Sequence, residues 1–230
     1  MIGTIARVTL KRISRGQAVW VALGISLIPV IVAMVLRQAA PASDRAEFTL
    51  DLYVVEMFVI AIVPALFVAS SIGEEIEDKT ITYLWSRPLP RWHVIAGKLV
   101  ALAPIAAALV LVGWLLAIQI AEDRLAPLST IIGIVAASLA VSFVAAGIGT
   151  LAPKHGMALT IIYMLLFDVP IGEIPASLQV LSITHQARLL AGIAVRGVRE
   201  TDRLAPAITL AVLGGVWLAV GLWKIRRTEA

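Results

Sequence analysis

The chain contains no cysteine, so it can form no disulfide, no thiolate nucleophile and no cysteine-ligated metal site. Charged residues are also scarce, because Asp, Glu, Lys and Arg make up 15% of the 230 residues. An ordinary soluble domain carries about 25% charged residues. A soluble enzyme of this length would need a larger polar shell, so these two shortages argue against one.

Apolar residues take up the composition instead. They make up 60% of the chain, and the mean hydropathy is +0.96. A membrane-crossing helix needs about 20 apolar residues, and the chain has six such runs. They are Ala18–Leu36, Leu52–Ile72, Val94–Ala121, Pro127–Leu151, Met157–Ile171 and Ala205–Trp223. The runs are continuous rather than alternating, which predicts an all-α membrane protein with six transmembrane helices in one domain over residues 1–230.

Positive residues predict the orientation, because Lys and Arg concentrate in cytoplasmic loops. With the N-terminus inside, 12 of the 19 fall on the cytoplasmic side: Arg7, Lys11, Arg12, Arg15, Lys79, Arg87, Arg91, Lys98, Lys154, Lys224, Arg226 and Arg227. We therefore expect both termini in the cytoplasm. The three histidines then fall on both sides of the membrane, which predicts no metal site: His93, His155 and His185.

Residues 1–16 have the pattern of an amphipathic helix. At 100° per residue one face is apolar, formed by Ile2, Ile5, Ala6, Leu10 and Ile13. The opposite face is basic, formed by Arg7, Lys11 and Arg15. This segregation favours a helix lying along the lipid headgroups over an ordinary basic flank. The apolar stretch that follows, about 18 residues, is longer than the roughly 7–15 of a signal peptide, so we expect no cleavage.

The segment after the second run, residues 73–93, has the most informative pattern of the loops. It opens with four acids, Glu74, Glu75, Glu77 and Asp78. One side of a helix would then carry Ile76, Thr80, Tyr83 and Leu84. Acids at the start and a cation at the end suit the helix dipole, and the following prolines end the helix. A helix this short needs a partner surface, and a solvated connector is an equally compatible interpretation.

This loop resembles the signature region of the permease subunits of ABC-2 type transporters. That family shares an acid-rich stretch, a residue pair ending in Thr, a Leu-containing turn, and Pro-x-x-Arg before Gly-Lys. The match comprises Glu74-Glu75, Glu77, Lys79-Thr80, Tyr83-Leu84, Arg87-Pro88, Pro90-Arg91 and Gly97-Lys98. Lys79 stands where the family usually has Gly.

The resemblance implies a permease with residues 1–16 as an elbow helix and 73–92 as a coupling loop that docks on two copies of a separate ABC ATPase. It implies a second permease subunit, with a homodimer favoured over a heterodimer. It also implies a bacterial or archaeal cytoplasmic membrane. The implied ATPase-interface residues are Glu74, Glu75, Glu77, Asp78, Lys79, Thr80, Tyr83, Leu84, Arg87 and Arg91.

The chain has no phosphate-binding loop of its own. Its one Gly-Lys pair is Gly97-Lys98, with Trp92 in place of the first glycine and Leu99 in place of the hydroxyl residue. We therefore predict that the chain is not an enzyme and holds no cofactor, and that the partner ATPase binds ATP and Mg. The basic residues lie beside apolar runs, which indicates membrane lipids rather than nucleic acid as partners.

Two acids, Glu56 and Asp168, fall inside predicted crossings. A carboxylate at the centre of a membrane helix costs roughly 2.5–3.5 kcal/mol on insertion scales. They are candidates for the outer part of a translocation path. The alternatives are snorkelling to the headgroups or a buried hydrogen bond between helices.

Two further patterns leave their partners open. The fourth run carries small residues at four-residue spacing, which allows close packing either within one subunit or across a dimer. The long segment 172–204 is rich in Ile and Leu, and we expect short helices that dip into the outer interface.

Two other classes of protein share single features with this chain. Glu74-Glu75 resembles the paired glutamates of CAAX-type membrane proteases, but the later Phe-x-x-x-His of that family is missing, because Ile171 follows Phe167 at that spacing. A secondary carrier or channel could instead use Glu56 and Asp168. No convincing repeat between the two halves of the sequence supports a carrier.

Overall fold

The computed structural model describes residues 2–13, 16–39, 48–77, 92–174, 177–193 and 203–227, and every regular element in these ranges is a helix. Within these ranges, six helical stretches are long and apolar enough to cross a membrane, as the sequence predicts. They are Gln17–Ala39, Phe48–Ile76, Trp92–Glu122, Leu128–Leu151, Pro153–Glu173 and Leu204–Arg227.

Several of these spans consist of more than one element. In chain order the elements are α1 (Ile2–Ile13), α2 (Gln17–Ser26), α3 (Ile28–Ala39), α4 (Phe48–Pro64), η2 (Ala65–Ala69), α5 (Ser70–Glu77), α7 (Trp92–Glu122), α8 (Leu128–Leu151), η3 (Pro153–His155), α9 (Gly156–Ile162), η4 (Tyr163–Asp168), α10 (Val169–Glu173), η5 (Ser177–Leu181), α11 (Ile183–Ala191) and α12 (Leu204–Arg227).

Prolines lie at the interruptions of the spans. Pro29 follows the break between α2 and α3, and Pro64 directly precedes η2, a π-helical turn. Pro170 follows η4, which is also π-helical. Because proline has no N–H to donate, the helix around it rearranges locally while the span continues.

The helix α8 forms the centre of the bundle, and its small residues pack within this one subunit. A Cβ added at Gly133 would lie 2.7 Å from the Ala191 side chain of α11, and one at Gly147 would lie 2.6 Å from the Trp217 carbonyl oxygen of α12. At Gly149 the neighbour is the Ala69 carbonyl oxygen of η2, at 3.1 Å. The small residues of α8 therefore allow α11, α12 and η2 of the same chain to pack close to it, as the spacing predicts.

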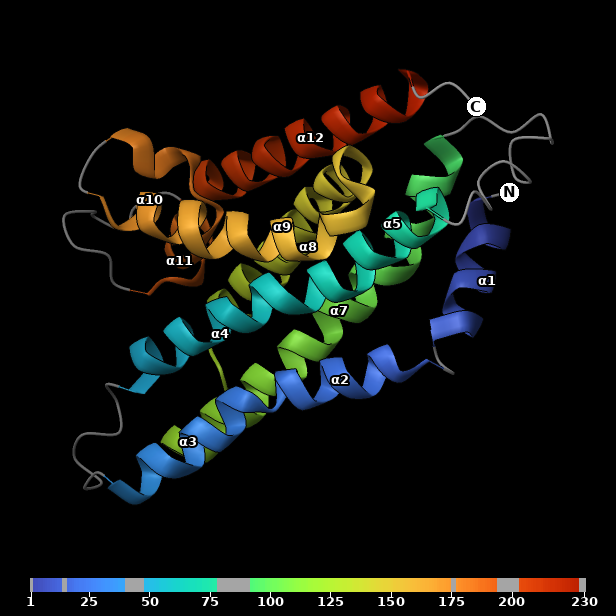
Figure 1. Ribbon diagram of the computed structural model, residues 1–230. Coiled ribbons are helices and arrows are strands. Elements are labelled where there is room, and N and C mark those ends of the chain that lie inside the picture. The colour runs from blue at the N-terminus through green and yellow to red at the C-terminus, as the bar shows by residue number, and fades with distance from the viewer. Residues whose placement is uncertain are drawn as a thin grey trace.

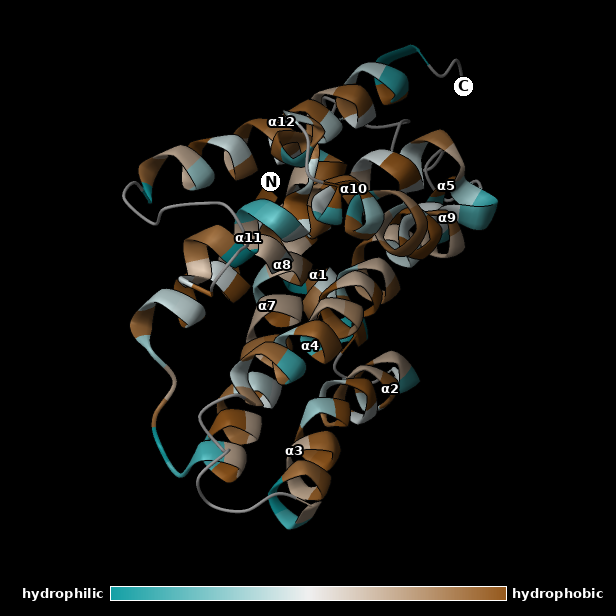
Figure 2. Ribbon diagram, turned by 90° about the vertical axis from the view of Figure 1, so that its left-hand side faces the viewer, coloured by the Kyte–Doolittle hydropathy of each residue, from teal (hydrophilic) through white to brown (hydrophobic). Residues whose placement is uncertain are grey.

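The bundle has two ends that differ in their elements (Figure 1). One end, here called the α1 side, holds α1, α5, the start of α7 and the end of α12. The other end, the α11 side, holds the end of α3, the start of α4, α10 and α11. Figure 2 shows that the spans are apolar along most of their length, with polar residues mostly toward the helix ends, as expected of a bundle surrounded by lipid.

The segment between the fifth and sixth spans contains the short helices η5 and α11. The helix α11 is buried along most of its length, including its polar residues Thr184, His185 and Gln186. It ends at Gly192, whose φ of +72° is the left-handed conformation that glycine adopts without a Cβ penalty. The short helix is therefore part of the packed bundle.

Candidate functional site

The acids of the coupling segment belong to the end of the second span. Glu74, Glu75 and Glu77 lie on α5, which continues directly from α4 through η2. The sequence predicts a separate helix that begins at Glu74. In the structure, residues 74–77 are instead the last residues of α5. The remaining members of the predicted interface lie outside the described residues: Asp78, Lys79, Thr80, Tyr83, Leu84, Arg87 and Arg91.

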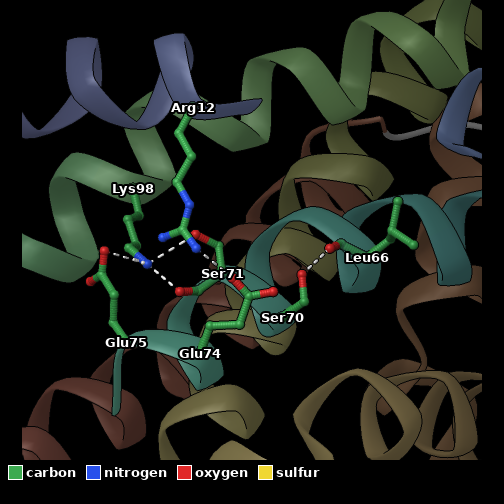
Figure 3. Close-up of polar contacts among 7 residues, drawn as sticks. All are labelled: Arg12, Leu66, Ser70, Ser71, Glu74, Glu75 and Lys98. Atoms are coloured by element: carbon green, nitrogen blue, oxygen red, sulfur yellow. Dashed lines mark hydrogen bonds and ion pairs between the residues drawn. The ribbon is translucent and has the colours of Figure 1, made fainter. Parts of the chain in front are cut away.

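Glu75 is paired with a buried lysine of α7 (Figure 3). The Lys98 side chain is 1% exposed, and its Nζ lies 3.0 Å from Glu75 Oε1. Nζ also donates to Ser71 Oγ at 2.9 Å and to the Ser71 carbonyl oxygen. A buried ammonium is costly unless it is paired and hydrogen-bonded, and these three acceptors meet that need. The start of α7 is thereby fixed to α5.

The neighbouring acid is bound to a different helix. Arg12 Nη2, on α1, lies 3.2 Å from Glu74 Oε2, with both side chains more than half exposed. The same helix packs on α7, since a Cβ at Gly97 would lie 2.8 Å from the Ile5 side chain. Of the two consecutive glutamates at the end of α5, Glu74 therefore links it to α1 and Glu75 links it to α7.

A cavity of about 240 Å³ adjoins this cluster between α1, α2 and the end of the second span. Arg12, Ser70, Ser71 and both glutamates line its polar part, and Phe67 lies on its apolar wall. Ser70 donates its hydroxyl to the Leu66 carbonyl oxygen, within the same helix. The cluster is therefore a group of polar side chains that lies between packed helices and adjoins a cavity.

Sequence reasoning missed Arg12, Ser71 and Lys98 as members of this site. Lys98 could have been found, because a lone lysine within an apolar run needs a partner in the protein. From the sequence alone it is an orientation signal and part of the stretch that resembles the family signature. Arg12 and Ser71 carry no such signal, since they are common types at the ends of membrane helices.

On the α11 side, Asp168 has a defined structural partner. Its two carboxylate oxygens accept from the backbone N–H groups of Ile183 at 2.7 Å and Thr184 at 2.9 Å. The Ser182 hydroxyl donates to it at 3.3 Å. These are the first residues of α11, where unpaired N–H groups and the helix dipole favour a carboxylate. Of the two alternatives to a path residue, a buried hydrogen bond describes Asp168 and snorkelling does not, since the residue is 2% exposed.

Glu56 has a different environment. It is 0% exposed, and neither of its carboxyl oxygens has a hydrogen-bond partner among the described residues. Its side chain therefore does not snorkel to the headgroups in this chain. Glu56 is therefore buried inside the bundle without a hydrogen-bond partner among the described residues, whereas Asp168 is hydrogen-bonded to the start of α11.

His185 lies at the start of α11 and is 7% exposed. Burial lowers its pKa, and a hydrogen bond with the Gly172 backbone opposes that shift. Within the described ranges, no group of three or more metal-ligating side chains comes together around this histidine or elsewhere.

The model of one protein family, described as ABC-2 family transporter protein, matches residues 39–180. The match covers more than half of the chain and includes α4, α5, α7 and α8. It therefore contains the two glutamates, Lys98 and both buried acids. A search of curated proteins gives no match to this chain.

Proposed function

Because the chain belongs to the ABC-2 transporter family, we propose that it is the permease subunit of an ABC exporter, and that it forms the translocation path and couples to a separate ATPase. Six apolar spans agree with such a role. The ATPase, in two copies, would bind ATP and Mg, since the sequence of the permease has no phosphate-binding loop. The permease itself would catalyse no reaction.

The observation that carries this proposal is the pair of links made by Glu74 and Glu75. Residues 78–91 come next in the sequence and contain most of the stretch that resembles the family signature. A force applied there by an ATPase would act on α5. It would then reach α1 through Arg12 and α7 through Lys98.

The proposal places the α1 side in the cytoplasm of a bacterial or archaeal cell, with both termini there. The excess of Lys and Arg on that side supports this orientation, and so does the fact that α1 and the end of α12 lie at the same end of the bundle (Figure 1). Two permease subunits, identical rather than different, would complete the transporter. Lipids surround the spans.

Single cysteines test the orientation without background, because the natural chain has none. In intact cells, cysteines at Ser43, Asp123 and Ala176 should react with a membrane-impermeant reagent. One at Asp78 should react only after the membrane is opened. Labelling of position 78 from outside would contradict the orientation.

A second experiment tests the coupling. Asp at both Tyr83 and Leu84 places charge in the expected contact with the ATPase, which should abolish co-purification of the ATPase and its stimulation by the permease. The matched control is Leu125→Asp, in the loop on the α11 side, where the side chain is 85% exposed. Normal hydrolysis coupled to transport in the doubly substituted protein would show that the segment is not the docking site.

One observation keeps a secondary carrier as the second candidate. Glu56 is a buried acid without a partner among the described residues, whereas Asp168 is already bound to α11. In a secondary carrier, Glu56 would therefore be the acid that takes part in transport, since Asp168 is already hydrogen-bonded within the protein. Transport by reconstituted permease without any ATPase, lost in Glu56→Gln, would favour it.

A further inference from the structure

A groove of about 390 Å³ opens in the half of the membrane next to the α11 side. One wall is α4, the second is the end of the fifth span, and α11 closes the polar end. The volume falls within the range of about 300–1,000 Å³ that is typical of ligand sites. Neither Glu56 nor Asp168 is among its lining residues.

The groove is apolar along its length and open to lipid. Leu50, Val54 and Phe58 are spaced four residues apart on α4, and each is between 42% and 53% exposed. Leu165 and Val169 face them from the fifth span. At a rise of 1.5 Å per residue the wall on α4 runs about 12 Å into the membrane. Such a surface suits an acyl chain.

Polar groups gather at the end of the groove next to α11. Arg188 Nη1 lies 3.0 Å from Glu173 Oε1, and the guanidinium side chain is 21% exposed whereas the carboxylate side chain is 70% exposed. The positive group therefore lies deeper in the groove than the negative one. In a zwitterionic phospholipid the phosphate is likewise closer to the acyl chains than the ammonium.

A second observation points to a bound group. Tyr53 lines the groove and is 2% exposed, yet its hydroxyl is buried with no hydrogen-bond partner among the described residues. A buried hydroxyl without a partner costs free energy, so such groups normally find one. Arg188 lines the same groove. Together they offer a hydroxyl donor and a guanidinium to one phosphate.

We infer that this groove holds one zwitterionic phospholipid of the leaflet on the α11 side. Its acyl chain would lie along α4, with the phosphate at Tyr53 and Arg188 and the ammonium at Glu173. The bound lipid would join α4 to α11, two elements distant in sequence. This inference requires only that the chain lies in a membrane. It is separate from the proposed coupling to an ATPase.

Native mass spectrometry of the delipidated full-length protein tests this inference. Dioleoyl phosphatidylethanolamine should bind at least about tenfold more tightly than dioleoylglycerol, the difference expected when hydrogen bonds to a charged group are gained. It should also bind more tightly than dioleoyl phosphatidylglycerol, which lacks the ammonium. Equal binding of all three lipids would refute the site, and equal binding of the two phospholipids would refute the role of Glu173.

Variants separate this site from general lipid contact. Tyr53→Phe keeps the ring that packs edge-on against Trp114 and removes the hydroxyl, and Arg188→Gln removes the cation. Each should weaken binding of phosphatidylethanolamine about tenfold. Arg37→Gln is the matched control, because this arginine is also ion-paired on the α11 side, with Asp123 at 2.8 Å, and does not line the groove.

A second pair of variants tests the acyl-chain wall without touching the polar end. Val54→Trp should fill the groove and lower lipid occupancy, whereas Val112→Trp should not. Both valines are 53% exposed, and Val112 on α7 is not a lining residue. If Val54→Trp and Tyr53→Phe both retain wild-type binding, the groove is not the lipid site.

Discussion

The buried Lys98–Glu75 ion pair should make the two partners unequal in substitution. Glu75→Met removes the carboxylate and leaves an ammonium that is 1% exposed, whereas Lys98→Met leaves a carboxylate that is 20% exposed. Breaking a buried pair by removing one partner costs about 3–5 kcal/mol. We expect that cost for Glu75→Met. Lys98→Met should lose less, about 1–3 kcal/mol, because the carboxylate side chain that remains is less deeply buried than the ammonium.

The doubly substituted protein gives the sharper result. Replacing both partners of a buried pair by apolar side chains is often neutral or stabilising, so Glu75→Met with Lys98→Met should recover most of the loss. The free energy of unfolding in mixed micelles, measured at fixed lipid content, reports all three variants. The double-substitution cycle then isolates the coupling between the two residues.

An exposed pair in the same cluster serves as the control. Arg12→Gln removes an ion pair whose side chains are 64% and 55% exposed, so its loss should stay below about 1 kcal/mol. Equal effects of Arg12→Gln and Glu75→Met would refute the reasoning, and so would a doubly substituted protein that is less stable than either single variant. The first result would mean that burial of Lys98 carries no energetic weight.

Three further predictions concern the rest of the bundle. Asp168→Asn leaves one oxygen to accept from the two N–H groups of α11, so the free energy of unfolding should fall by about 1–3 kcal/mol. Glu56→Gln should be near neutral, because it breaks no hydrogen bond among the described residues. Unfolding in mixed micelles measures both variants. Gly133→Ala should lower the thermal midpoint by pushing α11 away from α8, whereas Gly215→Ala, with no neighbour within 4 Å, should not, and a drop in the second would contradict the packing argument. Burial lowers the pKa of His185 in the folded state, so the stability that its neutral form contributes is complete above its ordinary pKa of 6.5 and is lost as the pH falls below that value. The thermal midpoint should therefore fall between pH 7.5 and pH 5, and His185→Gln should remove this pH dependence.

The sequence was sufficient for the elements of this fold because lipid imposes a simple rule on length and polarity. Six apolar runs predicted six spans, and the least apolar, Pro153–Glu173, is also the one whose expected bounds were shortest. The interruptions at Pro29 and Pro64 were not predicted, since a proline within a span can leave the helix nearly straight or divide it.

The site was only partly predictable, because its partners are distant in sequence. Glu75 and Lys98 are 23 residues apart, and Asp168 reaches α11 across 15 residues. Hydropathy marks each as unusual but does not say which groups meet. The groove at Tyr53 had no sequence signal, because its polar end combines residues from three elements that only tertiary packing brings together.

The central position of α8 has a consequence for the order of events during synthesis. Its tightest glycine contacts are with elements that leave the ribosome later, Ala191 on α11 and Trp217 on α12. A nascent chain that ends before α12 would thus present a glycine-lined face of α8 to the bilayer, where nothing in the chain can yet cover it. Chains released early should be substrates for membrane quality-control proteases, although most of their spans are already inserted.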